Sequence, residues 1–355
     1  MGMSTDTAPV RAGEELDLDA LRRYLADKLP GADSGLAVEQ FPGGHSNLTY
    51  LVRVAGDEYV LRRAPLGPVP PTAHDMAREY RILAAVSPLF RPAPRPIALC
   101  EDASVIGAVF YLMERRRGVI LRHAIPPGIL AQPNYAARIS GAFLDCFAAL
   151  HAIDLDSNGL NALGKPDGFV ERQVKGWSER WTRAQTGPSP EMDRVMAWLA
   201  ANVPPSGKAT LVHNDYKLDN VMIEEANIDR VGAVLDWEMT TIGDPMIDVG
   251  LTLCYWTHAA TPEVAGGGVP SFTAEPGWFT RDQFLQAYAT KTGRALAGLK
   301  FHEVLGVFKL AVILQQIYFR FVKGQTQDQR FVNFGSRVAA LTRIAAKIVD
   351  GSAKD

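Results

Sequence analysis

The sequence contains few cysteines and carries almost no net charge. Its 355 residues include only Cys100, Cys146 and Cys254, which lie far apart, with no C-x-x-C pair and no histidine cluster to complete a metal site. Scattered thiols fit a reducing compartment, so we expect a cytoplasmic protein. The formal charge of -2 provides no broad positive field for nucleic acid. We therefore predict no nucleic-acid partner.

Long uninterrupted apolar segments are also missing. The N-terminus has no apolar signal core, and residues 1–14 are predicted to be a disordered leader. Lys309, Gln315 and Arg320 interrupt the most apolar late stretch, residues 305–322. Charged residues are costly in a bilayer, so this stretch is predicted to be a buried helix. We predict no membrane partner.

The pattern of apolar residues predicts an α+β protein with two lobes, as expected for a chain too long for one core. Residues 15–114 would form a small N-terminal lobe, a five-stranded antiparallel sheet plus helix. Residues 115–350 would form a larger, mainly helical lobe with one hairpin at 221–236, and the hinge would lie at about 114–118. The expected N-terminal elements are helices over residues 15–31 and 73–86 and strands over 36–41, 48–54, 58–64, 97–101 and 107–114.

The segment LVHNDYKLDNVMI, residues 211–223, has the strongest chemical signature. His213, Asp215 and Asn220 follow the spacing H-x-D-x-x-x-x-N of a kinase catalytic loop. A carboxylate in this loop accepts the proton of the substrate hydroxyl, and the amide oxygen five residues later reaches a magnesium ion. His213 is interpreted as a structural residue.

Asp236 follows the second strand of the predicted hairpin, which would bring it beside Asn220. Magnesium takes few protein ligands when it is bound to phosphates, so these two residues and a triphosphate would make a sufficient shell. The alternative is a capping or turn role for each polar residue. Their joint order and spacing favour the metal site.

Two features of the N-terminal lobe suggest phosphate binding. The loop between its first two strands could place backbone N–H groups over phosphates, although a glycine pair is also common in ordinary turns. Arg62 ends the third strand, and Glu79 interrupts the apolar stripe of the following helix. A buried carboxylate needs a cation, so we predict an ion pair between them, the alternative being a solvated Glu79. The loop residues are Gly43, Gly44, His45, Ser46 and Asn47.

These segments together resemble the aminoglycoside phosphotransferase family, a branch of the protein-kinase-like fold that includes choline and homoserine kinases. The resemblance spans roughly residues 36–320 and is closest to the branch resembling the kinase domain fused to some acyl-CoA dehydrogenases. The segments that carry it are GGHSNLTY, YVLRRAP, REYRIL, YLMERRRG, HNDYKLDN and LDWEMTTIGDPMIDVG.

The resemblance implies the fold and assigns roles to matching residues. Asp215 would be the catalytic base, Asn220 and Asp236 would bind Mg²⁺, and Arg62 with Glu79 would position the phosphates of ATP. The remaining implied roles are adenine contacts from the backbone of Glu114 and Arg116, hydrogen bonds from Asp244 to the catalytic loop, and a helix cap at Asp248.

Three positions qualify this assignment. Arg62 stands where most kinases have lysine, and the two cations differ in geometry. Asp236-Trp237-Glu238 replaces D-F-G, and no A-P-E segment follows, which argues against a protein substrate. Lys217 either stabilises charge on the transferred phosphate or is a solvated loop lysine.

The acceptor is expected to bind the helical lobe, chiefly residues 155–203 and 250–335. Residues 271–355 contain twelve Lys or Arg and six Asp or Glu, an excess of +6 that suits an anionic or acyl-type hydroxylated molecule better than a polycation. We therefore predict an ATP- and magnesium-dependent kinase for a small-molecule hydroxyl. The alternatives are an aminoglycoside or choline-type kinase and a pseudokinase without turnover. Candidate walls of the acceptor site are Trp177, Trp181, Tyr255 and Trp256, which could equally be core residues.

Overall fold

The computed structural model describes residues 6–42, 47–65, 75–122, 124–257 and 272–351. The chain divides into two compact units. The first unit comprises Met1–Arg117 and Ala233–Glu238, and the second comprises Gly118–Gly232 and Met239–Asp355. The short segment that carries Asp236 therefore belongs with the first unit, although it follows a hairpin of the second.

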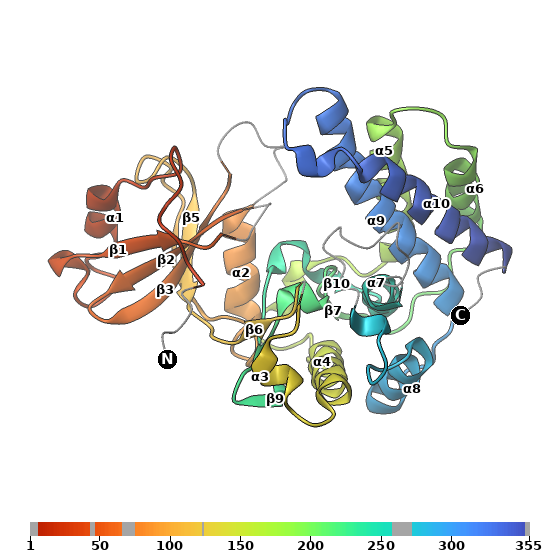
Figure 1. Cartoon of the computed structure of the whole chain (residues 1–355), viewed down its shortest axis with the longest axis horizontal. Coiled ribbons are helices and arrows are strands. Elements are labelled where there is room, and N and C mark those ends of the chain that lie inside the picture. The colour runs from red at the N-terminus through yellow and green to blue at the C-terminus, as the bar shows by residue number, and fades with distance from the viewer. Residues whose placement is uncertain (1–5, 43–46, 66–74, 123, 258–271, 352–355) are drawn as a thin grey trace. The chain divides into compact units, whose positions relative to one another are not determined.

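The first unit contains a five-stranded antiparallel sheet in the order β1-β2-β3-β5-β4 (Figure 1), which confirms the predicted sheet. In β5, Phe110 and Leu112 join the cluster that includes Leu21 and Leu25 of α1, whereas Tyr111 meets α2 on the other face. This alternation gives each face of the sheet its own helix. The elements are α1 (Leu18–Leu25), β1 (Ala37–Gln40), β2 (Leu48–Val54), β3 (Asp57–Arg63), α2 (Met76–Val86), β4 (Pro96–Cys100) and β5 (Phe110–Glu114).

Local capping sets where the helices of this unit begin. Asp17 accepts a hydrogen bond from Ala20 N (2.9 Å) ahead of α1, and Asp75 accepts one from Arg78 N (2.8 Å) ahead of α2. Both are N-cap arrangements that satisfy backbone donors left free at a helix start.

The expectation of a disordered leader is wrong for the residues next to the sheet. Ala8 pairs with Gln40 of β1 through two backbone hydrogen bonds of 2.9 and 2.8 Å. Arg11 N donates to the Gln40 side chain (2.9 Å), and the Tyr50 hydroxyl donates to Glu14 O (2.7 Å). The edge of β1 offers unpaired backbone groups, and this polar segment satisfies some of them.

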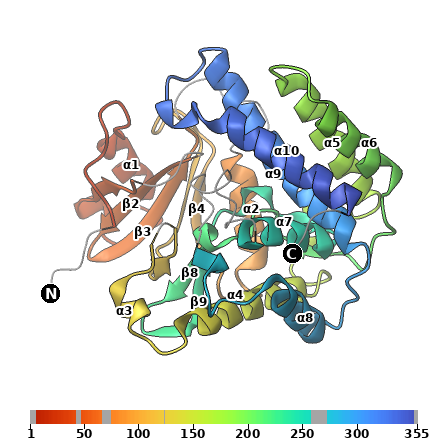
Figure 2. The ribbon, with the colours of Figure 1, turned by 45° about the vertical axis from the view of Figure 1, so that its right-hand side comes forward.

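The second unit is mainly helical (Figure 2). Its core is formed by α5, α6, α7, α9 and α10, which contribute most of one large apolar cluster. The sequence indicated a single hairpin in this lobe, but β7 also pairs with β10, and β6 pairs with β8. The elements are β6 (Val119–Ile120), α3 (Pro127–Leu130), α4 (Tyr135–His151), α5 (Phe169–Ala184), α6 (Pro190–Ala201), β7 (Thr210–Val212), β8 (Val221–Glu224), β9 (Asn227–Val234), β10 (Thr241–Gly243), α7 (Pro245–Thr257), α8 (Arg281–Thr292), α9 (Leu299–Val322) and α10 (Phe334–Asp350).

Helices α7 and α9 approach each other backbone to backbone. A Cβ atom on Gly306 of α9 would lie 2.5 Å from the carbonyl oxygen of Gly250 of α7, and one on Gly250 would collide with the His302 carbonyl. Only glycine permits this crossing. Helix α9 is long and apolar enough to cross a membrane, but 61% of its most apolar window is buried. The predicted buried helix is present.

Candidate active site

Arg62 and Glu79 form a buried ion pair in the first unit. Arg62 Nη1 lies 2.7 Å from Glu79 Oε1, and the two side chains are 10% and 0% exposed. The predicted pair is therefore present, and Glu79 is not a solvated residue at the edge of its helix. The strand and the helix are held together by opposite charges that neither residue could bury alone.

Asp236 is fixed beside this pair. Its backbone lies in the left-handed region, with φ at +66°, and Arg62 Nη2 lies 3.4 Å from Asp236 Oδ1. The next residue, Trp237, donates its N–H to Glu79 Oε1 (3.2 Å). A left-handed aspartate is strained and persists because neighbouring contacts hold it. Its side chain is 28% exposed.

The three charges act on one another electrostatically. Burial raises the pKa of Glu79 to about 7, with Asp236 and Glu238 adding to the rise while Arg62 opposes it. Burial lowers the pKa of Arg62, but Glu79, Tyr111 and Asp236 outweigh it and leave the value above the ordinary one. Arg62 therefore stays charged.

The phosphate loop and the hinge are described in part. Gly43, Gly44, His45 and Ser46 lie outside the described residues. Asn47 is buried, and its Nδ2 donates to Glu238 Oε2 (3.2 Å), a contact that the sequence did not predict. Nothing in the sequence around Glu238 indicated that its side chain would accept a hydrogen bond from Asn47.

At the hinge the side chains stabilise the chain itself. Glu114 N donates to Arg95 O (2.9 Å), and Glu114 Oε1 accepts from Arg95 N (2.7 Å) and lies 2.7 Å from Arg116. Arg116 also donates to Arg91 O (2.8 Å). The backbone contacts of Glu114 and Arg116 with adenine stay a prediction.

Replacing Arg62 by methionine is expected to lower the free energy of unfolding by about 3–5 kcal/mol, because Glu79 would stay buried without its cation. Arg63→Met is the matched control. Arg63 is also buried in β3, but it donates to the carbonyl oxygens of Ala64 and Ile106, so no carboxylate loses its partner. Urea unfolding of both variants measures the difference. Equal losses of unfolding free energy in the two variants would show that the ion pair stabilises the protein no more than the hydrogen bonds of Arg63 do.

In the second unit, the loop predicted to be catalytic places the Asp215 carboxylate between two donors. Asn220 Nδ2 donates to Asp215 Oδ2 (2.7 Å) and Asp215 O (2.9 Å), and Lys217 Nζ lies 3.0 Å from Asp215 Oδ2. The short turn Leu218–Asn220 brings these residues together. Because the amide nitrogen of Asn220 faces Asp215, its Oδ1 is the atom left for a metal ion, which suits the oxygen preference of magnesium.

Lys217 is not a solvated loop lysine. Its side chain is 20% exposed, and Nζ lies 4.8 Å from the centroid of the buried Tyr255 ring. Burial lowers the pKa of Lys217, but Asp215 and Tyr255 outweigh it and raise the value above the ordinary one. The ammonium therefore carries its charge beside Asp215. This geometry suits a group that stabilises negative charge on a transferred phosphate.

Asp248, and not Asp244, holds the catalytic loop. Its Oδ2 accepts from His213 N (2.5 Å), and its Oδ1 accepts from Asn214 N (2.6 Å). His151 Nε2 lies 3.2 Å from Oδ2, and His151 Nδ1 lies 2.7 Å from the Tyr288 hydroxyl. Burial raises the pKa of Asp248, but its bonds and charges with His151 and His213 outweigh that effect and lower it. A buried carboxylate thus fixes the backbone directly before Asp215.

The roles that the resemblance implied for the two aspartates were wrong. Asp244 accepts from Met246 N (2.9 Å) at the start of α7 and from Gly207 N (3.0 Å). It is the helix-capping residue. The sequence held the signal, because aspartate followed by Pro245 is the usual pattern at a helix start.

The described loop can orient a hydroxyl group and accept its proton at Asp215 Oδ1 or Oδ2. Lys217 forms an ion pair with one carboxylate oxygen, and Asp248 accepts a hydrogen bond from the loop backbone. Such positioning is the main protein contribution to phosphoryl transfer, together with charge stabilisation. No cluster of three or more His, Cys, Asp or Glu that could hold a metal occurs among the described residues, so phosphate and amide oxygens would have to complete a magnesium shell.

The four aromatic residues expected to line the acceptor site are all buried. Trp256 packs in a cluster with Phe143 and donates its Nε1–H to Phe279 O (2.8 Å), so it is a core residue. Tyr255 lies against Lys217 near the base, and Trp177 lies against Lys309.

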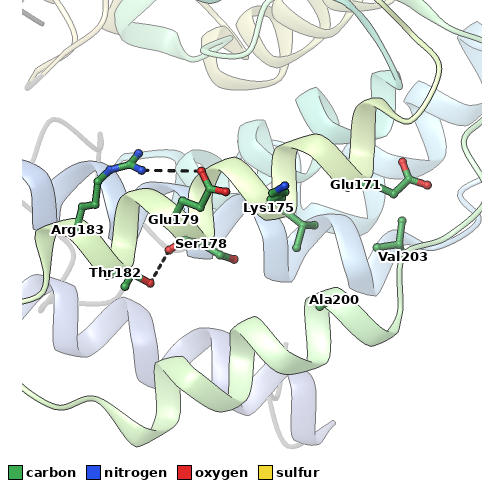
Figure 3. Close-up of a pocket in the computed structure, with 9 residues that line it drawn as sticks. Glu171, Lys175, Ser178, Glu179, Thr182, Arg183, Ala200 and Val203 are labelled. Carbon is green, nitrogen blue, oxygen red and sulfur yellow. Dashed lines mark hydrogen bonds and ion pairs between the residues drawn. The ribbon is translucent and has the colours of Figure 1, made fainter.

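A separate groove of about 590 Å³ lies between α5 and α6 (Figure 3). Its charged residues include Glu179 and Arg183, whose side chains form an ion pair of 3.8 Å along α5. None of the residues predicted to be catalytic lines this groove. The groove therefore offers no evidence about the reaction.

The model of the phosphotransferase enzyme family matches residues 37–298, which is most of the chain. The chain belongs to this family. The Mus musculus protein named acyl-CoA dehydrogenase family member 10 is 33% identical over 343 residues, covering 96% of the chain. The chain spans about a third of that relative's length, 32%. The similarity to the dehydrogenase-linked branch is confirmed.

Solved structures of other phosphotransferases share the fold. A Ralstonia eutropha protein solved as a candidate aminoglycoside phosphotransferase is 31% identical, with a TM-score of 0.80, and the match covers 96% of this chain and 100% of the other. An aminoglycoside phosphotransferase in complex with AMP-PNP and hygromycin B is 16% identical, with a TM-score of 0.57 over 91% of this chain and 98% of the other. That second likeness bears on the fold alone. The predicted protein-kinase-like α+β fold is confirmed.

Proposed function

We propose that this phosphotransferase moves the γ-phosphoryl group of ATP, with Mg²⁺, to a hydroxyl of a small molecule. The observation that carries the proposal is the fixed Asp215 carboxylate, bonded to Asn220 Nδ2 at 2.7 Å and to Lys217 Nζ at 3.0 Å. A base held in this way is suited to a hydroxyl proton. The proposal includes a cytoplasmic setting and no nucleic-acid or membrane partner.

The remaining roles follow from the chemistry of each group. In this proposal Asn220 and Asp236 each give an oxygen to Mg²⁺, which neutralises charge on the phosphates when bound. Arg62, held by Glu79, contacts the phosphates, and Lys217 stabilises charge on the transferred group. The complex of AMP-PNP with a structural neighbour supports a nucleotide as donor.

The acceptor in this proposal is an anionic or acyl-type hydroxylated metabolite. The excess of positive charge over residues 271–355 favours an anionic molecule. The name of the mouse relative, an acyl-CoA dehydrogenase family member, is in keeping with an acyl substrate. The neighbour bound to hygromycin B makes an aminoglycoside the second candidate.

A panel of acceptors tests the proposal. The purified chain, with ATP and MgCl₂, is assayed for ADP release with hydroxy acids, their thioesters, choline and aminoglycosides, each with and without EDTA. We expect magnesium-dependent turnover with a hydroxy acid or its thioester. Preferred turnover of aminoglycosides would overturn the acceptor class, and nucleotide binding without turnover on any acceptor would favour a pseudokinase.

A further inference from the structure

A buried lysine lies beneath the catalytic loop. Lys309 of α9 is 2% exposed, and its Nζ donates to the backbone oxygen of Asn214 (2.9 Å) and lies 3.4 Å from Asn214 Oδ1. The ring centroid of Trp177 is 5.5 Å from Nζ. The close crossing of α7 and α9 at Gly250 and Gly306 brings this part of α9 under the loop.

Asn214, the residue that Lys309 contacts, directly precedes the base. Its φ is +65°, in the left-handed region that residues other than glycine seldom adopt. Its N–H donates to Asp248 Oδ1 (2.6 Å), and its Nδ2 donates to Met239 O (3.1 Å). Lys309 supplies the donor for its carbonyl oxygen. The strained turn that aims Asp215 is thus held from three sides, by groups on different elements.

The surroundings of Lys309 indicate that a lysine at this position lowers the stability of the folded protein. Among the described residues, Nζ makes hydrogen bonds to Asn214 but no ion pair with a carboxylate. Burial lowers the pKa of Lys309 to about 8. Asp248 on α7 and Asp215 in the loop oppose that shift, whereas Lys217 in the loop and Arg180 on α5 add to it. An apolar side chain would pack here without burying a charge.

We propose that Lys309 is a positioning residue for the phosphoryl-transfer reaction, whose ammonium holds the Asn214 carbonyl and so keeps the Asp215 carboxylate aimed at the acceptor hydroxyl. This inference rests on the proposed function. A charged donor makes a stronger and shorter hydrogen bond than a neutral one, so the loop is held most firmly while Lys309 is protonated.

The test compares Lys309→Met with Lys300→Met, a matched control on the same helix. Lys300 Nζ also donates to a backbone oxygen, that of Val349 (2.9 Å), and lies 5.6 Å from the Trp198 ring. Unlike Lys309, it is exposed, and these contacts are with α10 and α6 and not with the loop. We expect Lys309→Met to lower kcat by about 10- to 100-fold, the cost of a small misplacement of a catalytic group. Its melting temperature should change little, because removal of a buried charge offsets the donor that the Asn214 carbonyl loses. Lys300→Met should keep the wild-type kcat.

The pH profile separates positioning from packing. In the wild type kcat should fall above a pH of about 8, as Lys309 loses its proton, and this limb should be absent in Lys309→Met. The ATP KM should change less than about twofold, because the interaction acts on the chemical step. A variant that keeps wild-type kcat, or loses activity only in proportion to its folded fraction, would overturn the proposal.

A measurement that needs no activity keeps this inference distinct from the proposed function. In ¹³C-lysine-labelled protein, one Cε resonance should titrate near pH 8 and be missing from Lys309→Met. The backbone amide resonance of Asp215 should shift with the same midpoint in the wild type alone. An Asp215 amide that ignores this titration would overturn the positioning role, even if no acceptor were turned over.

Discussion

Asp215→Asn is expected to lower kcat by about 10²- to 10⁴-fold, the usual contribution of a general base. The asparagine has nearly the same shape but cannot accept the hydroxyl proton. It should still bond to Asn220, because that contact needs only an acceptor oxygen. The KM for ATP should therefore stay close to the wild-type value. Steady-state kinetics with the acceptor found in the panel measures both constants.

Asp219→Asn is the control for this variant. Asp219 lies in the same short turn, Leu218–Asn220, so both substitutions remove one negative charge from the loop. The Asp215 carboxylate is bonded to both Asn220 and Lys217. We expect Asp219→Asn to retain most activity. Equal losses of kcat in the two variants would mean that the reaction depends on the negative charge of the loop and not on Asp215 as a specific base.

Asp248→Ala is expected to cost about 3–5 kcal/mol of unfolding free energy and to abolish turnover. The substitution leaves the N–H groups of His213 and Asn214 without their acceptor in a buried site, and it removes the partner of His151. Urea unfolding measures the stability. Asp229→Ala, which removes an exposed carboxylate paired with Arg138, is the control and should change stability by less than about 1 kcal/mol.

The loss of unfolding free energy in Asp248→Ala should depend on pH in a defined direction. The pKa of Asp248 is lower in the folded protein than the ordinary value of about 3.9, so the unfolded chain binds the proton more readily. Its stabilisation is complete above that ordinary value and is lost as pH falls through the folded pKa. The stability gap between wild type and Asp248→Ala should therefore shrink below about pH 4. A gap that grows on acidification would contradict the assigned carboxylate role.

The fold of the first unit was predictable because local patterns and long-range contacts agree there. Period-two alternation located the five strands. The Arg62–Glu79 pair followed from one carboxylate in an apolar stripe, since burial of a charge requires a partner. The loop Asp215, Lys217 and Asn220 was predictable as a motif because all three residues are close in sequence.

Other features of the fold and of the site depend on contacts between segments that are distant in the chain, so little in the sequence indicated them. Residues 8–14 pair with β1 through backbone groups, which composition does not reveal. Lys309 lies 95 positions from Asn214, and its place under the loop depends on the crossing of α7 and α9. In the sequence Lys309 only interrupted an apolar helix. The exchange of roles between Asp244 and Asp248 shows that a nearby local cue, aspartate before Pro245, was more informative than the family pattern.

The most direct test of the central claim is ³¹P NMR of the reaction itself. Wild-type protein, ATP, MgCl₂ and the best acceptor of the panel are followed beside Asp215→Asn under identical conditions. We predict a phosphate-monoester resonance that grows as the γ-phosphate of ATP disappears, that requires Mg²⁺, and that is nearly absent in the variant. Release of inorganic phosphate alone, or equal product from both proteins, would contradict transfer to a hydroxyl with Asp215 as the base.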